Sequence, residues 1–414
     1  MKGLVCLLLS AFILTGCGLQ KTKTKNILEV TDDGDVHYEG TNEFGEFNDH
    51  QIFLDPLAQE YEKGIVIANQ LSSVKTILNN GLENRVNVVL IGDGYTKSQL
   101  SQYAEDAQNI SNKFLDQEPL KSYKSYFNVH RVDVISSQSG VDNDLSNGRK
   151  RDTALDMNYW CSGIERLLCV NIQKAKQYAA NAPKVDQILA IANSTKHGGA
   201  GYWGDGVGTL ASRNPSSIET AIHEFGHTFG KLGDEYNYVG SNSSECLAKA
   251  NGSSLTSLQM LANKTKWFRW LDLNHIKTFE GTCYTNSGYR PTENSKMRTL
   301  GLPFYEVNSE QLIFSIYKKV KPIEAATAPG TYPKDRILRV TPMQPIGHTL
   351  DVRWYLNGNE ILNAAQKLNF SVASLRLTSG THKITVKVID KTSKVRDEVQ
   401  RAQLMTDSRT WTIQ

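Results

Sequence analysis

Apolar residues follow two different periods in the first three quarters of the chain, and together these periods predict a mixed α/β unit. The run 85–92 is almost entirely apolar and is bounded by turn residues, which is typical of a strand buried on both faces. The segment 98–114 repeats its apolar residues at helical spacing. The runs 127–135 and 186–193 predict two further strands. Strands that alternate with helices indicate an α/β fold.

From about residue 321 the pattern changes to short strands in which every second residue is apolar. The segments 350–356 and 382–389 both show this alternation, and Asn357-Gly358 is a signal for a tight hairpin. We therefore expect residues 321–414 to form a separate all-β unit, an immunoglobulin-like sandwich with Trp354 in its core.

The N-terminus has the features of an export signal. Lys2 precedes the apolar run 4–14, which is about half the length of a membrane-spanning helix. The run ends in Leu-Thr-Gly-Cys17, which resembles the bacterial lipobox. We expect residues 1–16 to be a lipoprotein signal peptide and 17–80 to be a tether with a short N-terminal segment. The alternative is an ordinary signal peptide followed by an incidental cysteine.

Acyl chains on Cys17 would attach the exported protein to a membrane. Gly18 stands where inner-membrane lipoproteins carry an aspartate, so we expect a location at the outer membrane or the cell surface. We expect the protein to be a monomer.

The composition narrows the class of partner. The chain has 414 residues, of which 39% are hydrophobic and 21% charged, as in ordinary globular proteins of two or three folded units. The 46 basic and 43 acidic side chains give a net charge of only +3, so we expect no nucleic-acid partner.

Four cysteines remain once the signal peptide is removed and Cys17 is lipidated. An exported protein meets oxidising conditions, so disulfides are expected. Local pairing of Cys161 with Cys169 and of Cys246 with Cys283 is favoured among the three connectivities. Four cysteines could instead bind a structural metal, although the sequence contains no CxxC pair.

The motif that carries chemistry is His223-Glu224-Phe225-Gly226-His227. Ser216 and Glu219 predict a capping box at the start of a helix that contains it. Residues four apart share one helix face, so the two histidines could bind one ion while Glu224 faces the water on that ion. The alternative is a pair of surface histidines on an amphipathic helix.

A catalytic zinc site needs a third protein ligand and an open position for water. In metzincin-type sites this ligand stands six residues after the second histidine, which is Gly233 in this chain. We therefore predict Asp234 as the third ligand, with Glu235 as the alternative. One carboxylate of such a pair often binds the metal while the other holds the neighbouring loop.

The stretch His223-Glu-Phe-Gly-His-Thr-Phe-Gly-Lys-Leu-Gly-Asp-Glu-Tyr236 resembles the signature of the IgA-peptidase-like zinc metallopeptidase family. Further segments similar to the family's pattern stand in the expected order: 87–96, 126–129, 139–142, 289–292, 297–298 and 390–396. The resemblance extends from about Arg85 to the C-terminus. It implies an α/β (α+β) metzincin-like zinc peptidase domain at 81–320, followed by the sandwich. The region before Arg85 is too short for the full N-terminal domain of longer members.

The resemblance also implies roles for individual residues. One zinc ion would be held by His223, His227 and Asp234, with Glu224 as the general base. Met297 would be the Met-turn residue, an apolar floor beneath the ligands, or alternatively an ordinary core residue. Tyr289 would stabilise the oxyanion, or alternatively pack beside Arg290.

Two further segments could contribute to binding. The glycine-rich stretch 193–201 either pairs as an edge strand with extended substrate or forms a surface loop. Asp142, Asn143, Asp144 and Asn147 could bind calcium, but their spacing does not match an EF-hand and favours a solvated turn.

The sequence therefore predicts an exported, lipid-anchored zinc endopeptidase that hydrolyses protein or peptide substrates. The family's name is not evidence that immunoglobulin A is the substrate. One alternative is a metallopeptidase of another HExxH clan, in which Glu235 or a remote glutamate is the third ligand. The other is a surface binding or adhesion lipoprotein whose zinc is structural and not catalytic.

Overall fold

The structure is a computed structural model, and it describes residues 39–41, 47–49, 71–81, 83–202, 204–237 and 244–414. The predicted signal peptide, Cys17 and most of the predicted tether lie outside these residues. In the part of the chain that is described, no helix has both the length and the apolar character needed to cross a membrane.

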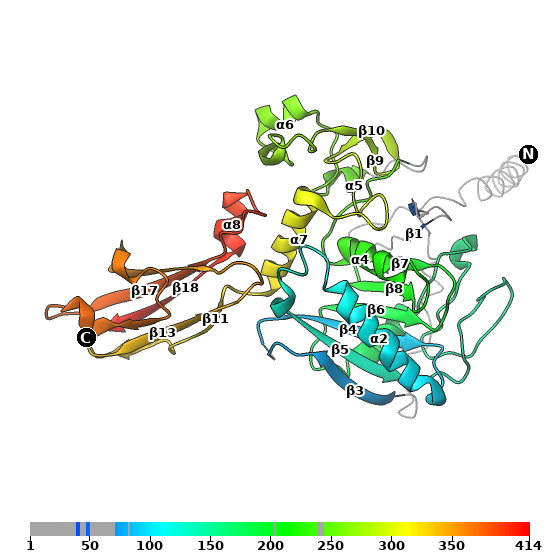
Figure 1. Ribbon diagram of the computed structural model, residues 1–414, viewed down its shortest axis with the longest axis horizontal. Coiled ribbons are helices and arrows are strands. Elements are labelled where there is room, and N and C mark those ends of the chain that lie inside the picture. The colour runs from blue at the N-terminus through cyan, green and yellow to red at the C-terminus, as the bar shows by residue number, and fades with distance from the viewer. Residues whose placement is uncertain (1–38, 42–46, 50–70, 82, 203, 238–243) are drawn as a thin grey trace, which may run out of the picture.

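A six-stranded sheet forms the centre of the first unit, in the order β3-β5-β4-β6-β8-β7 (Figure 1). The four inner strands run parallel, and each edge strand is antiparallel to its neighbour. The strands are β3 (Leu71–Leu78), β4 (Val86–Asp93), β5 (Phe127–Val134), β6 (Gln187–Ala192), β7 (Gly199–Tyr202) and β8 (Val207–Ala211). A separate two-stranded sheet is formed by β1 (Glu39–Thr41) and β2 (Phe47–Asp49).

Helices cover both faces of the six-stranded sheet, which explains why β4 is buried along its whole length. Its residues Val88 and Leu90 belong to the core shared with two helices, whereas Val89 and Ile91 belong to the core on the other face. Successive side chains of a strand point to opposite faces, so a strand between two helical layers must be apolar throughout. The helices of the first face are α2 (Leu100–Phe114) and α4 (Ser217–Thr228), and that of the second is α3 (Ile172–Ala179).

The predicted helix and three predicted strands of this unit are confirmed as α2, β4, β5 and β6. The N-terminal boundary differs from the prediction, because β3 lies within the segment assigned to the tether. Leu71–Leu78 pairs with β5 at the edge of the sheet. Val74, Ile77 and Leu78 are only half-buried, so the pattern of this strand is weaker than that of the inner strands.

Residues 244–304 form a small region beside the sheet, at the top of Figure 1. Met260, Trp267, Trp270 and Ile276 form its apolar core. Its elements are α5 (Ser244–Ala248), α6 (Ser257–Asn263), β9 (Phe279–Thr282) and β10 (Thr285–Arg290), and α7 (Tyr305–Lys319) follows it.

The two favoured disulfides are present. Cys161 is bonded to Cys169, and Cys246 is bonded to Cys283. The second bond ties α5 to the turn between β9 and β10.

The C-terminal part contains two sheets, which lie on the left in Figure 1. One has the order β11-β13-β16 and the other β12-β18-β17-β14-β15. Their strands are β11 (Ile323–Ala326), β12 (Thr331–Tyr332), β13 (Ile337–Pro342), β14 (Asp351–Leu356), β15 (Asn359–Glu360), β16 (Asn369–Ser371), β17 (His382–Ile389) and β18 (Thr406–Ile413), and α8 (Glu398–Leu404) precedes the last.

Trp354 is fully buried between these sheets, as the alternating pattern predicted. Its ring stacks on Phe370 of the other sheet at 4.9 Å and on Trp411 of its own sheet at 5.8 Å. Asn357 and Gly358 have positive φ and connect β14 to β15 in the predicted hairpin. The immunoglobulin-like identity of this unit stays a prediction.

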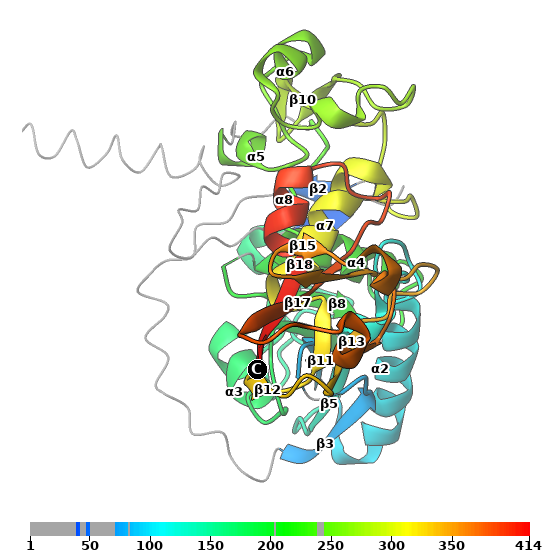
Figure 2. The ribbon, with the colours of Figure 1, turned by 90° about the vertical axis from the view of Figure 1, so that its left-hand side faces the viewer.

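The C-terminal sheets share one continuous apolar cluster with α7 and with the first face of the six-stranded sheet. A polar network is buried where they meet. Asp390 accepts hydrogen bonds from Tyr123 at 2.7 Å and Tyr317 at 2.8 Å, and its other oxygen lies 2.9 Å from His348 Nε2. Figure 2 shows the end of the molecule at which these C-terminal strands lie. The predicted boundary at residues 320 and 321 therefore does not divide the molecule into two separate cores.

Candidate metal centre

Helix α4 carries His223, Glu224 and His227, and all three side chains are fully buried. The helix begins at Ser217, close to the predicted position, but the predicted capping box is wrong. Ser216 makes no cap bond through its side chain. The Glu219 side chain pairs with the buried Lys296 and accepts hydrogen bonds from the Gly301 main chain at 2.9 Å and from Gln117 at 2.6 Å.

Asp234 completes a cluster with the two histidines, in which the three ligand atoms lie within 4.8 Å of one another. The Nε2 atoms of His223 and His227 are 3.0 Å apart, and Asp234 Oδ1 lies 3.5 and 3.3 Å from them, respectively. Ligand atoms about 2.0–2.1 Å from a tetrahedral zinc ion are separated by roughly 3.3 Å. The two imidazoles and one carboxylate therefore fit a zinc ion in both spacing and chemistry.

Main-chain carbonyl groups orient both imidazole rings. His223 Nδ1 is 2.8 Å from the Lys296 oxygen, and His227 Nδ1 is 2.8 Å from the Leu232 oxygen. A ring that donates from Nδ1 presents the lone pair of Nε2, here toward the other ligand atoms. Burial, and then the charge of His227, lower the pKa of His223 to about 3. His223 is therefore neutral near pH 7, which is the form that binds a metal.

The segment 282–284 holds Asp234. Thr282 Oγ1 and the Cys283 main-chain nitrogen donate to its main-chain oxygen at 2.8 and 3.1 Å. The Tyr284 hydroxyl donates to Oδ2, on the side away from the oxygen that faces the histidines. Both the backbone and the carboxylate of Asp234 are thus fixed by residues about fifty positions later in the chain.

Glu235 is directed into a different set of contacts. Ser295 donates to one carboxylate oxygen at 2.7 Å, and Asn251 and Asn308 donate to the other at 3.0 and 2.8 Å. Burial raises the pKa of this carboxyl group, while these donors oppose the shift. The two acidic residues therefore divide their tasks: Asp234 joins the histidines, and Glu235 connects neighbouring segments.

Met297 lies beneath α4, where the resemblance implied an apolar floor. It is fully buried, and a Cβ atom on Gly226 would lie 2.6 Å from its sulfur. Its main-chain oxygen accepts a hydrogen bond from the Glu235 nitrogen at 2.8 Å. Gly226 is therefore needed for the close packing of the methionine against the helix that carries the histidines.

The contacts of Tyr289 correspond to the alternative of a packed tyrosine, and its role at the oxyanion stays a prediction. Its side chain packs against the apolar cluster around Trp267, and its main chain exchanges two hydrogen bonds with Ser253. The tyrosine that contacts the metal-binding cluster is Tyr284, whose hydroxyl also lies 3.2 Å from that of Tyr236. Tyr284 was not predicted from the sequence. Its position after Cys283, a disulfide partner of Cys246, was the one available signal.

The edge strand β7 passes directly over Glu224. A Cβ atom on Gly201 would lie 2.5 Å from one carboxylate oxygen of Glu224, and one on Gly199 would lie 3.7 Å from the other. The absence of side chains at these two glycines thus allows the β7 backbone to lie close to the Glu224 carboxylate. On its outer side Gly199 forms an isolated parallel bridge with Leu167, and pairing of the strand with substrate stays a prediction.

The candidate calcium residues are engaged in turn contacts. Asp142 accepts from the Arg151 main chain and pairs with Lys150, and Asn143 accepts from Gly148 at 2.9 Å. Asp144 accepts a hydrogen bond from Ser194 at 3.2 Å. Among the described residues, the one cluster with metal-ligand geometry is that of His223, His227 and Asp234.

Comparison with known proteins agrees with the site. Residues 76–275 match the family model described as IgA Peptidase M64, a span that includes all three residues of the cluster and Glu224. This match confirms the resemblance predicted from the motif. A search of curated proteins finds no match to the chain.

Proposed function

We propose that this protein, whose residues 76–275 belong to an IgA-peptidase-like metallopeptidase family, is a zinc-dependent endopeptidase that acts on protein substrates. The observation that carries the proposal is the buried cluster of His223, His227 and Asp234, with Glu224 on the same helix. Two imidazoles and one carboxylate are a zinc ligand set that leaves a fourth position for water.

A zinc ion held by these three residues would supply Lewis-acid activation of a water molecule and of the scissile carbonyl group. Glu224 accepts a proton from the attacking water and delivers it to the nitrogen of the peptide bond, which leaves as an amine when the C–N bond breaks. Gly199 and Gly201 bring the β7 backbone close to Glu224, so a substrate strand along β7 would pass near this base.

We also propose that the protein is exported and held by lipid on Cys17 at the outer membrane or the cell surface. The support is the apolar run 4–14 with its lipobox-like end. The two disulfides are independent support, because such bonds persist outside the reducing cytoplasm. Labelling with a radioactive fatty acid tests the anchor: Cys17→Ser should abolish incorporation.

The two alternative functions make different demands on the site. A structural zinc site is closed by four protein ligands, whereas the cluster found in the described part of the chain offers three. A peptidase with Glu235 as its third ligand would require that carboxylate to leave Ser295, Asn251 and Asn308. Both observations favour the proposed endopeptidase.

The decisive experiment compares the mature chain with its Glu224→Gln variant. Zinc content is measured by metal analysis, and cleavage is measured on a denatured protein and on peptides blocked at both ends. We expect both proteins to bind about one zinc ion per chain, and only the parent to cut internal bonds. Equal cleavage by the variant would refute the role of Glu224. A parent that binds zinc but cuts neither kind of substrate would favour the binding lipoprotein.

A further inference from the structure

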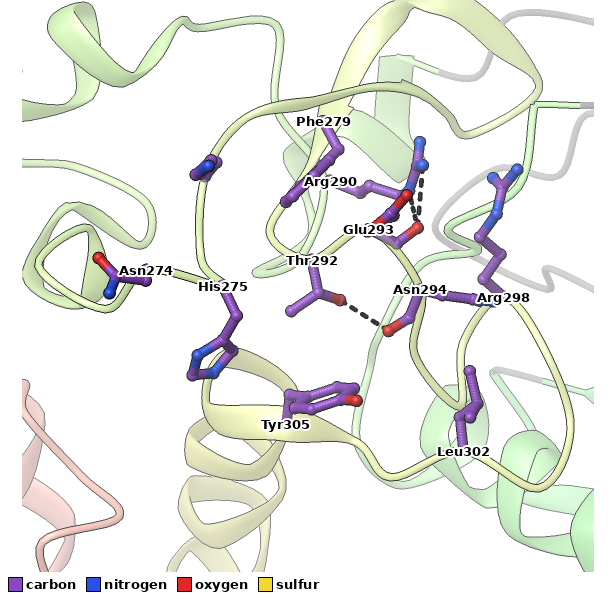
Figure 3. A pocket seen from close by; sticks show the side chains of 11 residues that line it. Asn274, His275, Phe279, Arg290, Thr292, Glu293, Asn294, Arg298, Leu302 and Tyr305 are labelled. Atoms are coloured by element: carbon purple, nitrogen blue, oxygen red, sulfur yellow. Dashed lines mark hydrogen bonds between the residues drawn. The ribbon is translucent and has the colours of Figure 1, made fainter.

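A polar cavity of about 750 Å³ lies on the outer side of the loop that carries Met297. Figure 3 shows that residues of the loop 274–279, the stretch 290–302 and the first turn of α7 surround it. Its volume is in the range of cavities that bind a ligand of a few residues' size. The function proposed above does not use this cavity.

Three cations line the cavity, against one acidic side chain, Glu293. Arg290 is buried, and the hydrogen bonds of its guanidinium group go to the main-chain oxygens of Glu280, Gly281 and Glu293. Carbonyl groups satisfy the N–H donors of an arginine but do not neutralise its charge. The carboxylates of Glu235 and Glu293 act on Arg290 through their charge. A carboxylate that entered the cavity would add negative charge beside the three cations.

Arg298 adds a second guanidinium group with the same kind of bonding, because its Nη1 donates to the main-chain oxygen of Glu235 at 2.8 Å. Burial, and then the positive charge of Arg298, lower the pKa of Arg290 to about 10, although the charges of Glu235 and Glu293 oppose this shift. The two arginines are thus close enough to destabilise each other. An anion between them would relieve this repulsion.

The third cation, Lys277, is exposed on the loop 274–279. Its main chain is fixed by a hydrogen bond to the Pro291 oxygen at 2.9 Å, so the loop that carries it is tied to the opposite wall. An exposed lysine at the rim of a cavity can attract an anion from solution at little cost in desolvation.

The remaining walls suit a peptide better than a small inorganic anion. Phe279 and Tyr305 offer aromatic faces, and Thr292 and Asn294 offer polar groups. Thr292 and Asn294 can form polar contacts with the main chain of a bound peptide. Peptides with acidic side chains combine all the matching features: N–H donors, apolar carbon and carboxylates.

We propose that this cavity is an auxiliary site that binds an acidic segment of a protein substrate through its side-chain carboxylates. The word substrate rests on the proposed peptidase function, whereas the binding of acidic peptide does not. The loop that carries Met297 forms part of both sites, because Arg298 contacts the Glu235 backbone and Asn294 directly precedes Ser295. A segment held here would tether a substrate close to the metal centre.

The test measures binding of a short glutamate-rich peptide, blocked at both ends, by isothermal titration calorimetry. The Glu224→Gln variant of the mature chain is used, so that the peptide is not cut. The matched probe is the same peptide with glutamine in place of glutamate. We expect the acidic peptide to bind about tenfold more tightly than the glutamine peptide, with an affinity that falls as salt is raised.

Lys277→Glu and Lys113→Glu form the matched pair of variants, because both lysines are exposed and both reversals change the net charge equally. Lys113 lies on α2, far from the cavity lining. We expect Lys277→Glu to weaken the affinity for the acidic peptide about three- to tenfold. Lys113→Glu should leave this affinity within about twofold of the parent. Cleavage of a neutral peptide by either variant with Glu224 intact should be unchanged.

Equal binding of the two peptides, or equal effects of the two lysine variants, would overturn the auxiliary site. If the protein cuts peptides but does not prefer the acidic peptide, the auxiliary site is refuted and the proposed peptidase function stands. A preference for acidic peptide in a protein that never cuts would refute the peptidase and leave the binding site standing.

Discussion

Tyr284→Phe removes one hydroxyl group that supports Asp234, the aspartate of the candidate metal-binding cluster. That hydroxyl donates to Asp234 Oδ2, and the tyrosine is buried, so water does not readily replace it. A hydrogen bond to a charged group contributes about 1.5–3 kcal/mol. Loss of a partner that orients a metal ligand weakens metal affinity about 10- to 100-fold. We therefore expect Tyr284→Phe to raise the dissociation constant for zinc by about 10- to 100-fold.

The assay is competition for zinc against a chromophoric chelator, followed by peptide cleavage at saturating zinc. Saturating zinc should restore most of the activity of Tyr284→Phe, because the lost hydroxyl holds a ligand and does not touch the substrate. Thermal unfolding of the metal-free proteins checks that the fold is intact. Unchanged zinc affinity in a folded Tyr284→Phe protein would refute the reasoning.

Tyr289→Phe is the matched control, since it removes the same group from the tyrosine that the family resemblance singled out. Its ring packs against the Trp267 cluster, so we expect zinc affinity and kcat within about twofold of the parent. If Tyr289 stabilises the oxyanion, the same variant will instead lose kcat at unchanged zinc affinity. The two variants thus distinguish a tyrosine that supports zinc binding, which changes zinc affinity, from one that stabilises the oxyanion, which changes kcat.

Three further predictions concern stability, each measured by unfolding of the metal-free protein. Glu219→Gln leaves the buried Lys296 unpaired and should cost about 3 kcal/mol, and adding Lys296→Met should recover part of it, whereas full additivity would contradict the pairing. Replacing Cys246 and Cys283 by serine opens a loop spanning 37 positions and should cost about 2–4 kcal/mol. Reducing agent should therefore destabilise the parent by about this much more than the variant, because the Cys161–Cys169 bond is reduced in both. Burial alone would raise the pKa of Asp390, but hydrogen bonds from a histidine and two tyrosines lower it below 3.8. The stabilisation from ionised Asp390 is therefore fully present above pH 3.8 and is lost as the pH falls through the lower folded-state pKa. Asp390→Asn should be less stable than the parent at neutral pH. A difference in stability that does not shrink in acid would contradict this sign.

Helices and strands with a regular pattern of buried positions could be predicted from the sequence. The strand β4 is apolar at nearly every position because helices cover both faces, and α2 shows a clear stripe because one side faces solvent. The edge strand β3 was not predicted because its residues from Ser73 to Leu78 are half-buried or exposed, so its pattern resembles that of a loop. The HExxH residues were predictable since their spacing is a local property of one helix.

The side-chain contacts that could not be predicted from the sequence join segments that are distant in the chain. Glu219 has the spacing of a capping box, yet its carboxylate accepts a hydrogen bond from Lys296, 77 positions away. Tyr284 reaches Asp234 across 50 positions, and the turn that directs it depends on Cys283 and its disulfide. A capping pattern predicts only hydrogen bonds between residues close in sequence. Because an unpaired buried charge is costly, an ion pair with a distant residue can replace such a bond.

These long-range contacts also indicate how much of the chain the proposed catalytic unit needs. The family match ends at residue 275, but the oxygen that orients His223 belongs to Lys296, and the hydroxyl on Asp234 belongs to Tyr284. Asn308, at the start of α7, is a third such partner through Glu235. A chain that ended at 275 would keep every metal ligand and lose the groups that orient them. Because α7 shares its apolar core with the C-terminal sheets, these sheets become part of the scaffold that holds the ligands in place.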